Sequence, residues 1–304
     1  MPTGFNNRRI VLGATLAMLL ALGAALAFTS PPGLLSLIDG MVGGGRGTHR
    51  TGDGVPFGTH GQMLDVWQPS GGPHRSLPVV IFWYGGGWTH GSRGAYAFAG
   101  RAFARQGFIA IVPDYRKVPQ VRFPAFLQDG AEAVKWARDH VADYGGDPHR
   151  IALAGHSAGA YTVAMLTLDP RWLRAEGVDP AIVKAAVGLC GPYDFYPFTV
   201  ERAAAAMRGA ADPRLTQPIN FARRDAAPML LISGGDDVQV HAHNAINLTA
   251  RLRAVGGRVI HEDYPDLSHE NVVMALSKPF SGKGPVLDHV AAFLSREMLA
   301  IPTR

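Results

Sequence analysis

Short apolar runs alternate with amphipathic stretches along most of this 304-residue chain, and this alternation restricts its fold more than any other feature. Continuous apolar runs of about four to eight residues are typical of strands buried on both faces, whereas apolar residues spaced three and four apart are typical of helices. The pattern predicts an α/β fold with a mostly parallel open sheet and helices on both faces. Strands are expected at 63–67, 78–84, 108–115, 150–155, 185–191, 228–234 and 258–264, and helices at 94–107, 126–141, 158–168, 243–256 and 285–299.

The strand at 150–155 leads into the sequence "GHSAG" (155–159), which an expected helix follows. Ligands of open α/β sheets bind at the carboxyl ends of the strands, so a turn at this place is where chemistry is expected. A G-x-S-x-G turn between a strand and a helix is typical of a nucleophile elbow, whose glycines permit a sharp bend that exposes the serine hydroxyl. Ser157 is therefore the candidate nucleophile. A dinucleotide-binding fingerprint is excluded, because it would need glycine at this position.

Two polar turns, "GGDDVQV" (234–240) and "PDLSHEN" (265–271), follow the last two expected strands. A serine hydroxyl is a weak nucleophile that needs a base, and the base needs an acid to orient it. In hydrolases with a G-x-S-x-G elbow on such a sheet, the three residues follow one another in the order serine, acid, histidine. His269 is the candidate base, and the acid is Asp237 or its neighbour Asp236.

The remaining histidines of this region raise the question of a metal site. "HAH" (241–243) precedes His261 and His269 in the chain. It opens an expected helix, however, and residues two apart on a helix do not face the same way. His261 falls within a strand and is interpreted as a packing residue. We expect no metal and no cofactor.

Three consecutive glycines, Gly85, Gly86 and Gly87, follow the apolar run at 78–84. Glycine loses more backbone freedom on folding than any other residue, so three together need a reason. Attack on an ester carbonyl creates an oxyanion, which N–H donors stabilise at about 2.7–3.1 Å, and side chains on the donor loop would obstruct that approach. We expect this loop to supply two donors and Ala158 to supply another.

The chain resembles the α/β-hydrolase esterases and lipases related to hormone-sensitive lipase, in particular small bacterial carboxylesterases similar to feruloyl esterases and kynurenine formamidases. The resemblance covers residues from about 55 to 300 and is carried by "LDVWQP", "YGGGW", "VPDYR", "FPAFLQDGAEAVKW", "DPHRIALAGHSAGA", "GGDDVQV" and "SHEN". It implies that the oxyanion donors are Gly86, Gly87 and Ala158. It likewise implies that the acid is Asp237 and the base His269. One residue departs from the family pattern, because the histidine that opens the glycine loop in the family is Tyr84 here, and this concerns the geometry of the loop rather than the mechanism.

The segment 192–225 interrupts the alternation of strands and helices, and we interpret it as a small cap over the substrate pocket. Its first part is rich in aromatic residues, from which we select Tyr193 and Phe195 as candidate pocket residues. Trp88, beside the glycine loop, is a further candidate wall of the pocket.

The N-terminal residues 1–30 are predicted to be a signal peptide or a membrane anchor. Two arginines precede an uncharged apolar stretch at 10–28, which would span roughly 28 Å as a helix, close to the thickness of a bilayer. Signal peptides usually have a shorter apolar region, but "ALA" (25–27) is a usable cleavage site. Because arginines stay on the cytoplasmic side, the remainder is expected to face the periplasm or exterior from the inner membrane, or to be secreted or periplasmic after cleavage. Residues 31–50, rich in glycine, are predicted to be a flexible linker, and 51–304 the catalytic domain.

Composition adds few further constraints. The formal charge of +5 is spread along the chain without a clustered basic stripe, which argues against a nucleic-acid partner. Cys190 is the only cysteine, so no intrachain disulfide forms. The oligomeric state is not indicated.

The sequence thus predicts a serine carboxylesterase whose partner is a small-molecule ester, and which contacts the membrane through its N-terminal helix if this is not cleaved. Ser157 would attack the ester, His269 would transfer the proton, and Asp237 would orient the imidazole. Two alternatives stay open: an arylformamidase or other amide hydrolase with the same triad, and a non-catalytic, membrane-tethered binding protein on this fold.

Overall fold

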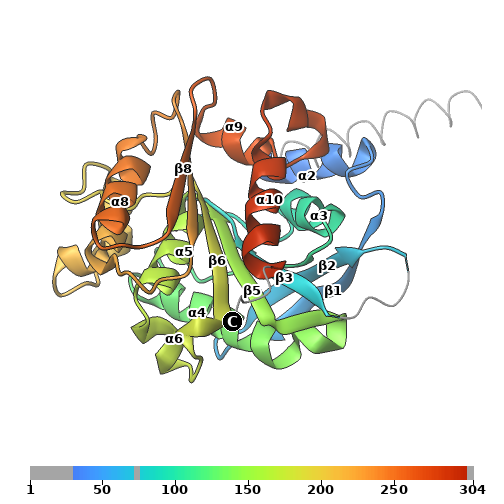
Figure 1. The fold of residues 1–304 in the computed structure, drawn as a ribbon, viewed down its shortest axis with the longest axis horizontal. Helices are drawn as coiled ribbons and strands as arrows, with labels where there is room; N and C mark the ends of the chain where they lie inside the picture. The colour runs from blue at the N-terminus through green and yellow to red at the C-terminus, as the bar shows by residue number, and fades with distance from the viewer. Residues whose placement is uncertain (1–29, 72–75, 300–304) are drawn as a thin grey trace, which may run out of the picture.

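An eight-stranded sheet organises residues 30–71 and 76–299, which are the residues that the structure, a computed structural model, describes (Figure 1). The strand order is β1-β2-β4-β3-β5-β6-β7-β8. Strand β2 is antiparallel to both of its neighbours, β1 and β4, and all other neighbouring pairs are parallel. The strands are β1 (Thr48–Phe57), β2 (Gln62–Pro69), β3 (Leu77–Trp83), β4 (Ile109–Pro113), β5 (Gly146–His156), β6 (Val183–Leu189), β7 (Met229–Gly234) and β8 (Val259–Tyr264).

Helices connect most of the strands. They are α2 (Pro31–Met41), α3 (Ala97–Arg105), α4 (Ala125–His140), α5 (Ala158–Leu168), α6 (Arg171–Ala175), α7 (Glu201–Met207), α8 (His243–Ala254), α9 (His269–Met274) and α10 (Val286–Leu299). Helices α5 and α10 both pack on β5 and β6, from opposite faces of the sheet (Figure 1). Because both faces are covered, the central strands are almost entirely buried, as their continuous apolar runs require. The predicted mostly parallel α/β sheet is therefore confirmed.

The two edge strands differ from the central ones. Strand β8 has only half-buried and exposed positions, and its glutamate and aspartate lie along the edge, where charge discourages pairing with another chain. Strand β1, at the other edge, is polar, contains glycine, and has irregular register around Gly52. Those properties explain why an apolar-run criterion does not detect β1.

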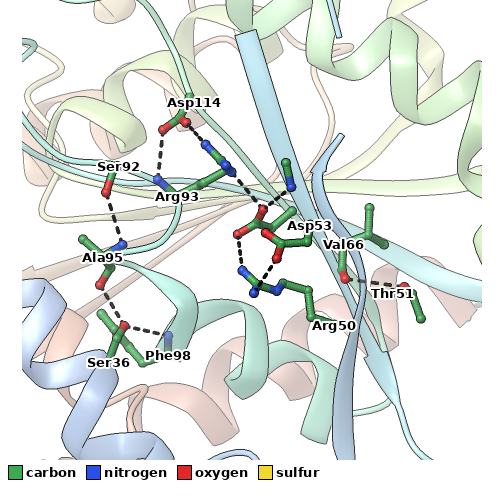
Figure 2. A network of polar contacts seen from close by, with 12 residues as sticks. Ser36, Arg50, Thr51, Asp53, Val66, Ser92, Arg93, Ala95, Phe98 and Asp114 are labelled. Carbon is green, nitrogen blue, oxygen red and sulfur yellow. Dashed lines mark hydrogen bonds and ion pairs between the residues drawn. The ribbon is translucent and has the colours of Figure 1, made fainter. Parts of the chain in front are cut away.

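The predicted flexible linker at 31–50 is wrong, because helix α2 and the start of β1 occupy it. The side chain of Ser30 caps the helix by accepting from Gly33 N, and a proline follows at the first helical position, where its missing N–H costs nothing. Asp39 is fully buried and forms a 2.7 Å ion pair with Arg101 of α3. Ser36 donates to the carbonyl of Ala95 (Figure 2). The folded unit therefore begins before residue 51.

The predicted signal peptide or anchor, residues 1–30, lies almost entirely outside the described residues. Among residues 30–71 and 76–299, no helix combines the length and apolar character needed to cross a bilayer.

Candidate active site

Ser157 lies at a strained turn between β5 and α5. Its φ of 54° and ψ of −121° place a non-glycine residue in a region that such residues rarely adopt. A Cβ on Gly159 would lie 2.0 Å from the carbonyl oxygen of Trp83, and one on Gly155 would lie 2.6 Å from the backbone of Gly159. The two glycines of "GHSAG" are therefore required because strand and helix backbones touch at this bend.

The glycine loop lies directly beside this turn. A Cβ on Gly85 would be 3.1 Å from Cβ of Ser157, and one on Gly86, whose φ is +130°, would be 2.1 Å from the carbonyl oxygen of His90. Among the described residues, the backbone N–H groups of Gly86, Gly87 and Ala158 donate to no protein acceptor. Three predicted donors thus border one serine, with Ala158 at the N-terminus of α5, where helix N–H groups attract negative charge.

His269, the first residue of α9, and Asp237, in the turn after β7, form a buried pair. Nδ1 of His269 lies 2.7 Å from Oδ2 of Asp237. The other carboxylate oxygen, Oδ1, accepts from the backbone N–H groups of Gln239 at 2.8 Å and Val240 at 2.7 Å. Burial raises the pKa of the Asp237 carboxyl, but these bonds, above all that from His269, outweigh it and hold the pKa below its usual value.

The structure distinguishes the two neighbouring aspartates. Asp236 is exposed, whereas Asp237 is buried and is the one that contacts the histidine. No hydrogen bond joins Oγ of Ser157 to His269 within the described part of the chain. Such contacts are often long before substrate binds.

His156, the residue before the serine, was not selected from the sequence, yet it joins two loops of the site. Its Nε2 lies 3.0 Å from the carbonyl oxygen of His269, and because a carbonyl only accepts, Nε2 carries the proton. The two imidazole rings lie 4.7 Å apart. Burial, followed by the electrostatic effect of the nearby His269 ring, lowers the pKa of His156 to about 3, so the His156 ring is neutral. The sequence offers no signal for this role, which depends on a residue 113 positions away.

Tyr84, which stands where the family has histidine, is fully buried between the rings of Tyr96 and Tyr115. Its hydroxyl donates to Oδ1 of Asp114 at 2.7 Å. Asp114 also accepts from Arg93, through the backbone N–H at 2.9 Å and the guanidinium at 2.6 Å (Figure 2). This network attaches the chain that follows the glycine loop to the end of β4, so the loop is held in place without the histidine.

The guanidinium of Arg93 continues the network toward β2. It lies 2.8 Å from Oδ1 of Asp65, which is buried and also contacts Arg50. Arg50 in turn forms an ion pair with Asp53 on β1 (Figure 2). Charged groups from β1, from β2, from the end of β4 and from the loop of Arg93 therefore stabilise one another.

A cleft of about 310 Å³ opens over Ser157. Its walls come from the glycine loop, from the first part of the 192–225 segment and from the start of α8. The lining residues are Gly87, Trp88, Ser157, Pro192, Asp194, Phe195, Tyr196, Pro197, Phe198, Thr199, Val200, Arg202, Ala203, Gln239, Val240, His241, His243 and Asn244.

Two of the three predicted pocket residues line this cleft. Trp88 and Phe195 have stacked rings with centroids 6.1 Å apart. The prediction is wrong for Tyr193, which is fully buried and packs where Cβ atoms on Gly188 and Gly191 would stand. Because both positions are glycine, the tyrosine ring turns into the core instead of the cleft.

One group of side chains within the described ranges could hold a metal ion by distance alone. The ligand atoms of Cys190, Asp237 and His269 all lie within 4.8 Å of one another. Asp237 and His269, however, are already hydrogen-bonded to each other, and burial, together with the charge of Asp237, raises the pKa of the Cys190 thiol. The protonated thiol is a poor metal ligand. His241 and His243 do not join His261 or His269 in such a group.

Comparison with known families agrees with this arrangement. Residues 64–252 match the BD-FAE family model. The chain belongs to the BD-FAE family. The matched region includes the glycine loop, the elbow and Asp237, and it ends before His269. The predicted resemblance to α/β-hydrolase esterases is thereby confirmed.

Individual relatives of this BD-FAE protein include two esterases of Mycobacterium tuberculosis. Esterase LipC is 34% identical over 262 residues, which cover 77% of this chain and 62% of LipC. Esterase LipQ is 31% identical over 267 residues, covering 80% of this chain and 63% of LipQ. The match thus spans less than two thirds of either relative.

Among solved structures, the apo form of esterase 2 from Thermogutta terrifontis superposes with a TM-score of 0.68. The sequences are 20% identical, and the match covers 85% of this chain and 97% of that one. At this identity the likeness establishes the fold.

Proposed function

We propose that this protein hydrolyses carboxylic esters through an acyl-enzyme, with Ser157 as nucleophile, His269 as base and Asp237 as the acid that orients it. The observation that carries the proposal is the buried 2.7 Å contact between His269 and Asp237 beside a strained serine turn. The resemblance to esterases LipC and LipQ supports the reaction class.

The reaction follows from the protonation states. With Nδ1–H donated to Asp237, Nε2 of His269 is free to accept the proton of Ser157 as Oγ attacks the carbonyl carbon. The N–H groups of Gly86, Gly87 and Ala158 would stabilise the oxyanion, each donor contributing about 10²–10³ in rate. Collapse expels the alcohol, which takes the proton from His269. Water then attacks the acyl-enzyme by the same route and releases the acid, and Oγ regains its proton.

The 192–225 segment is proposed as a cap over the substrate. This is supported by its first residues, 192–203, which supply much of the lining of the cleft above Ser157. Aromatic and aliphatic side chains on that wall suit an apolar part of the ester.

A fluorophosphonate probe and a short-chain p-nitrophenyl ester test the proposal. The full chain should be labelled and should turn over the ester, and Ser157→Ala, folded by circular dichroism, should do neither. Wild-type turnover in that variant would refute the serine mechanism. Absence of labelling in the unchanged protein would favour the non-catalytic binding protein, and faster cleavage of an N-formyl aryl amide than of the ester would favour the amide hydrolase.

We further propose that residues 1–30 direct the domain to the outer side of the cytoplasmic membrane. Arg8 and Arg9 before the uncharged stretch 10–28 support this. Protease added to spheroplasts should digest the domain, and cleavage only after lysis would contradict the topology.

A further inference from the structure

Arg202, the second residue of α7, lines the same cleft as Ser157. Its side chain lies against the glycine loop: a Cβ on Gly87 would be 3.1 Å from Cδ and 3.3 Å from Nε of Arg202. A cationic side chain is thus placed beside the loop that borders the scissile bond in the proposed mechanism.

This cation has no carboxylate partner among the residues that the structure describes. Its one polar contact there is a 3.3 Å hydrogen bond from Nη2 to the neutral Oε1 of Gln239. An arginine has five N–H donors in a planar fork, so most of its donors face solvent or the cleft.

The carboxylates near Arg202 already have other partners. Glu201 forms an ion pair with Arg208 at 3.3 Å. Asp194, which lines the cleft, accepts from Nδ2 of Asn247 at 2.7 Å. Glu270 accepts from the amide of Gln239. None of them neutralises Arg202 within 4.0 Å, so its charge is available to a bound molecule.

Arg202 is exposed, and the cleft that it lines has apolar residues on its walls, among them Trp88, Phe195, Phe198 and Val240. Charge-assisted bonds from arginine to carboxylate are short and directional. A ligand that fits both features has an apolar body and an anionic group.

We propose that the preferred substrates are esters that carry a carboxylate in addition to the scissile bond, bound by the guanidinium of Arg202. This inference rests on the proposed esterase function. The two forms of such a substrate carry the carboxylate on the acyl side or on the alcohol side of the ester, and matched substrate pairs distinguish them.

The experiment compares anionic and neutral esters on the full chain at low ionic strength. On the acyl side the pair is monoethyl adipate and ethyl hexanoate, and on the alcohol side it is 3-acetoxybenzoate and 3-methylphenyl acetate. For each pair the ratio of kcat/KM, anionic over neutral, is measured, so that a general loss of activity cancels. In the unchanged protein, at least one of the two ratios should exceed the same ratio in Arg202→Gln by about 10-fold or more, which is the usual range for a charged hydrogen bond.

Three controls define the outcome. Arg202→Lys should retain part of the preference. Arg214→Gln, which removes an exposed arginine of the same segment that does not line the cleft, should retain all of it. Added salt should weaken the preference in the unchanged protein. Hydrolysis of neutral esters with both ratios equal in Arg202→Gln and the unchanged protein would overturn this inference alone. Absence of any ester hydrolysis would overturn the proposed function, and this inference with it.

Discussion

Replacing Asp237 by asparagine should abolish most ester hydrolysis, because the contacts of its carboxylate determine how the new amide must lie. Oδ1 accepts from two backbone N–H groups, those of Gln239 and Val240, at 2.8 and 2.7 Å. The amide oxygen of asparagine must take this place, since an NH₂ there would face two donors. The NH₂ then points at Nδ1 of His269, which must accept, and the ring proton moves to Nε2. That tautomer cannot take the proton of Ser157.

The size of the effect follows from the alternative orientation. Turning the amide around would restore the useful tautomer but leave two buried N–H donors unpaired, at about 1–3 kcal/mol each. The two donors together cost about 2–6 kcal/mol, and at 1.36 kcal/mol per factor of ten this limits the active fraction to about 3 × 10⁻² to 4 × 10⁻⁵. The roughly 10⁴-fold loss for the corresponding change in trypsin-like enzymes falls within this range.

The assay is turnover of p-nitrophenyl butyrate near pH 8 by purified Asp237→Asn, with folding checked by urea denaturation. Asp236→Asn is the matched control, because Asp236 is exposed and precedes the acid by one residue. Its turnover should fall less than about 10-fold, in contrast to the roughly 10²-fold or larger loss for Asp237→Asn. A larger loss of turnover in Asp236→Asn than in Asp237→Asn, or no loss in either variant, would refute the argument.

Further predictions concern stability and the elbow. His156 has a folded pKa of about 3, below the unfolded value of 6.5, so its neutral form contributes stability that is present above pH 6.5 and is lost as the pH falls toward 3. The loss in the free energy of unfolding should approach ~1.4 kcal/mol per pH unit. In His156→Gln the urea midpoint should therefore change less between pH 7 and pH 5 than in the unchanged protein, and an equal pH dependence in both would contradict the argument. Gly159→Ala should destabilise the fold by about 1–3 kcal/mol and depress turnover, since its Cβ would meet Trp83 O at 2.0 Å; a wild-type melting curve would show that the elbow relaxes. Asp39→Ala leaves the buried Arg101 without its carboxylate and should lower the free energy of unfolding, measured by urea denaturation, by about 3–5 kcal/mol. Asp53→Ala, which removes an exposed ion pair, should lower it by less than about 1 kcal/mol. Equal effects would argue against a stabilising contribution from the buried ion pair of α2.

The central sheet was predictable because burial on both faces leaves a clear pattern in the sequence. Strands β3 and β7 are almost wholly apolar, and each appears within a residue or two of its predicted bounds. The sequence pattern does not reveal strand β1, because β1 is polar and is paired on one side only. It does not reveal helix α2 either, because the glycines that follow the helix favour a flexible linker in spite of the Ser30 cap. Local pattern thus identifies the elements that form the core, and fails where long-range contacts fix the chain.

The same distinction holds at the site. The turns after β5, β7 and β8 contain Ser157, Asp237 and His269, as the sheet's carboxyl edge predicts. The residues alone could not decide whether Asp237 or Asp236 contacts the histidine, because this depends on the direction in which each side chain leaves the turn. Tyr193 was misplaced because its ring fills space left by Gly188, near the end of β6, and by Gly191, in the turn that follows, and the sequence does not show this packing. Arg202 has no local signal, since its position beside Gly87 exists only after folding.

The docking of α2 determines where this chain can be shortened for production of the domain. A cut at residue 51, at the predicted domain boundary, would remove Asp39 together with the carbonyl of Ser36, the two groups that bind the guanidinium of Arg101. It would also leave the backbone N–H of Lys278 without its acceptor. A buried arginine without a counter-charge destabilises a fold by several kcal/mol, a large part of the stability of an ordinary domain. A truncated protein that begins before Ser30 keeps the helix cap and these contacts, so low yield from the shorter version would reflect a missing structural element rather than an intrinsically unstable fold.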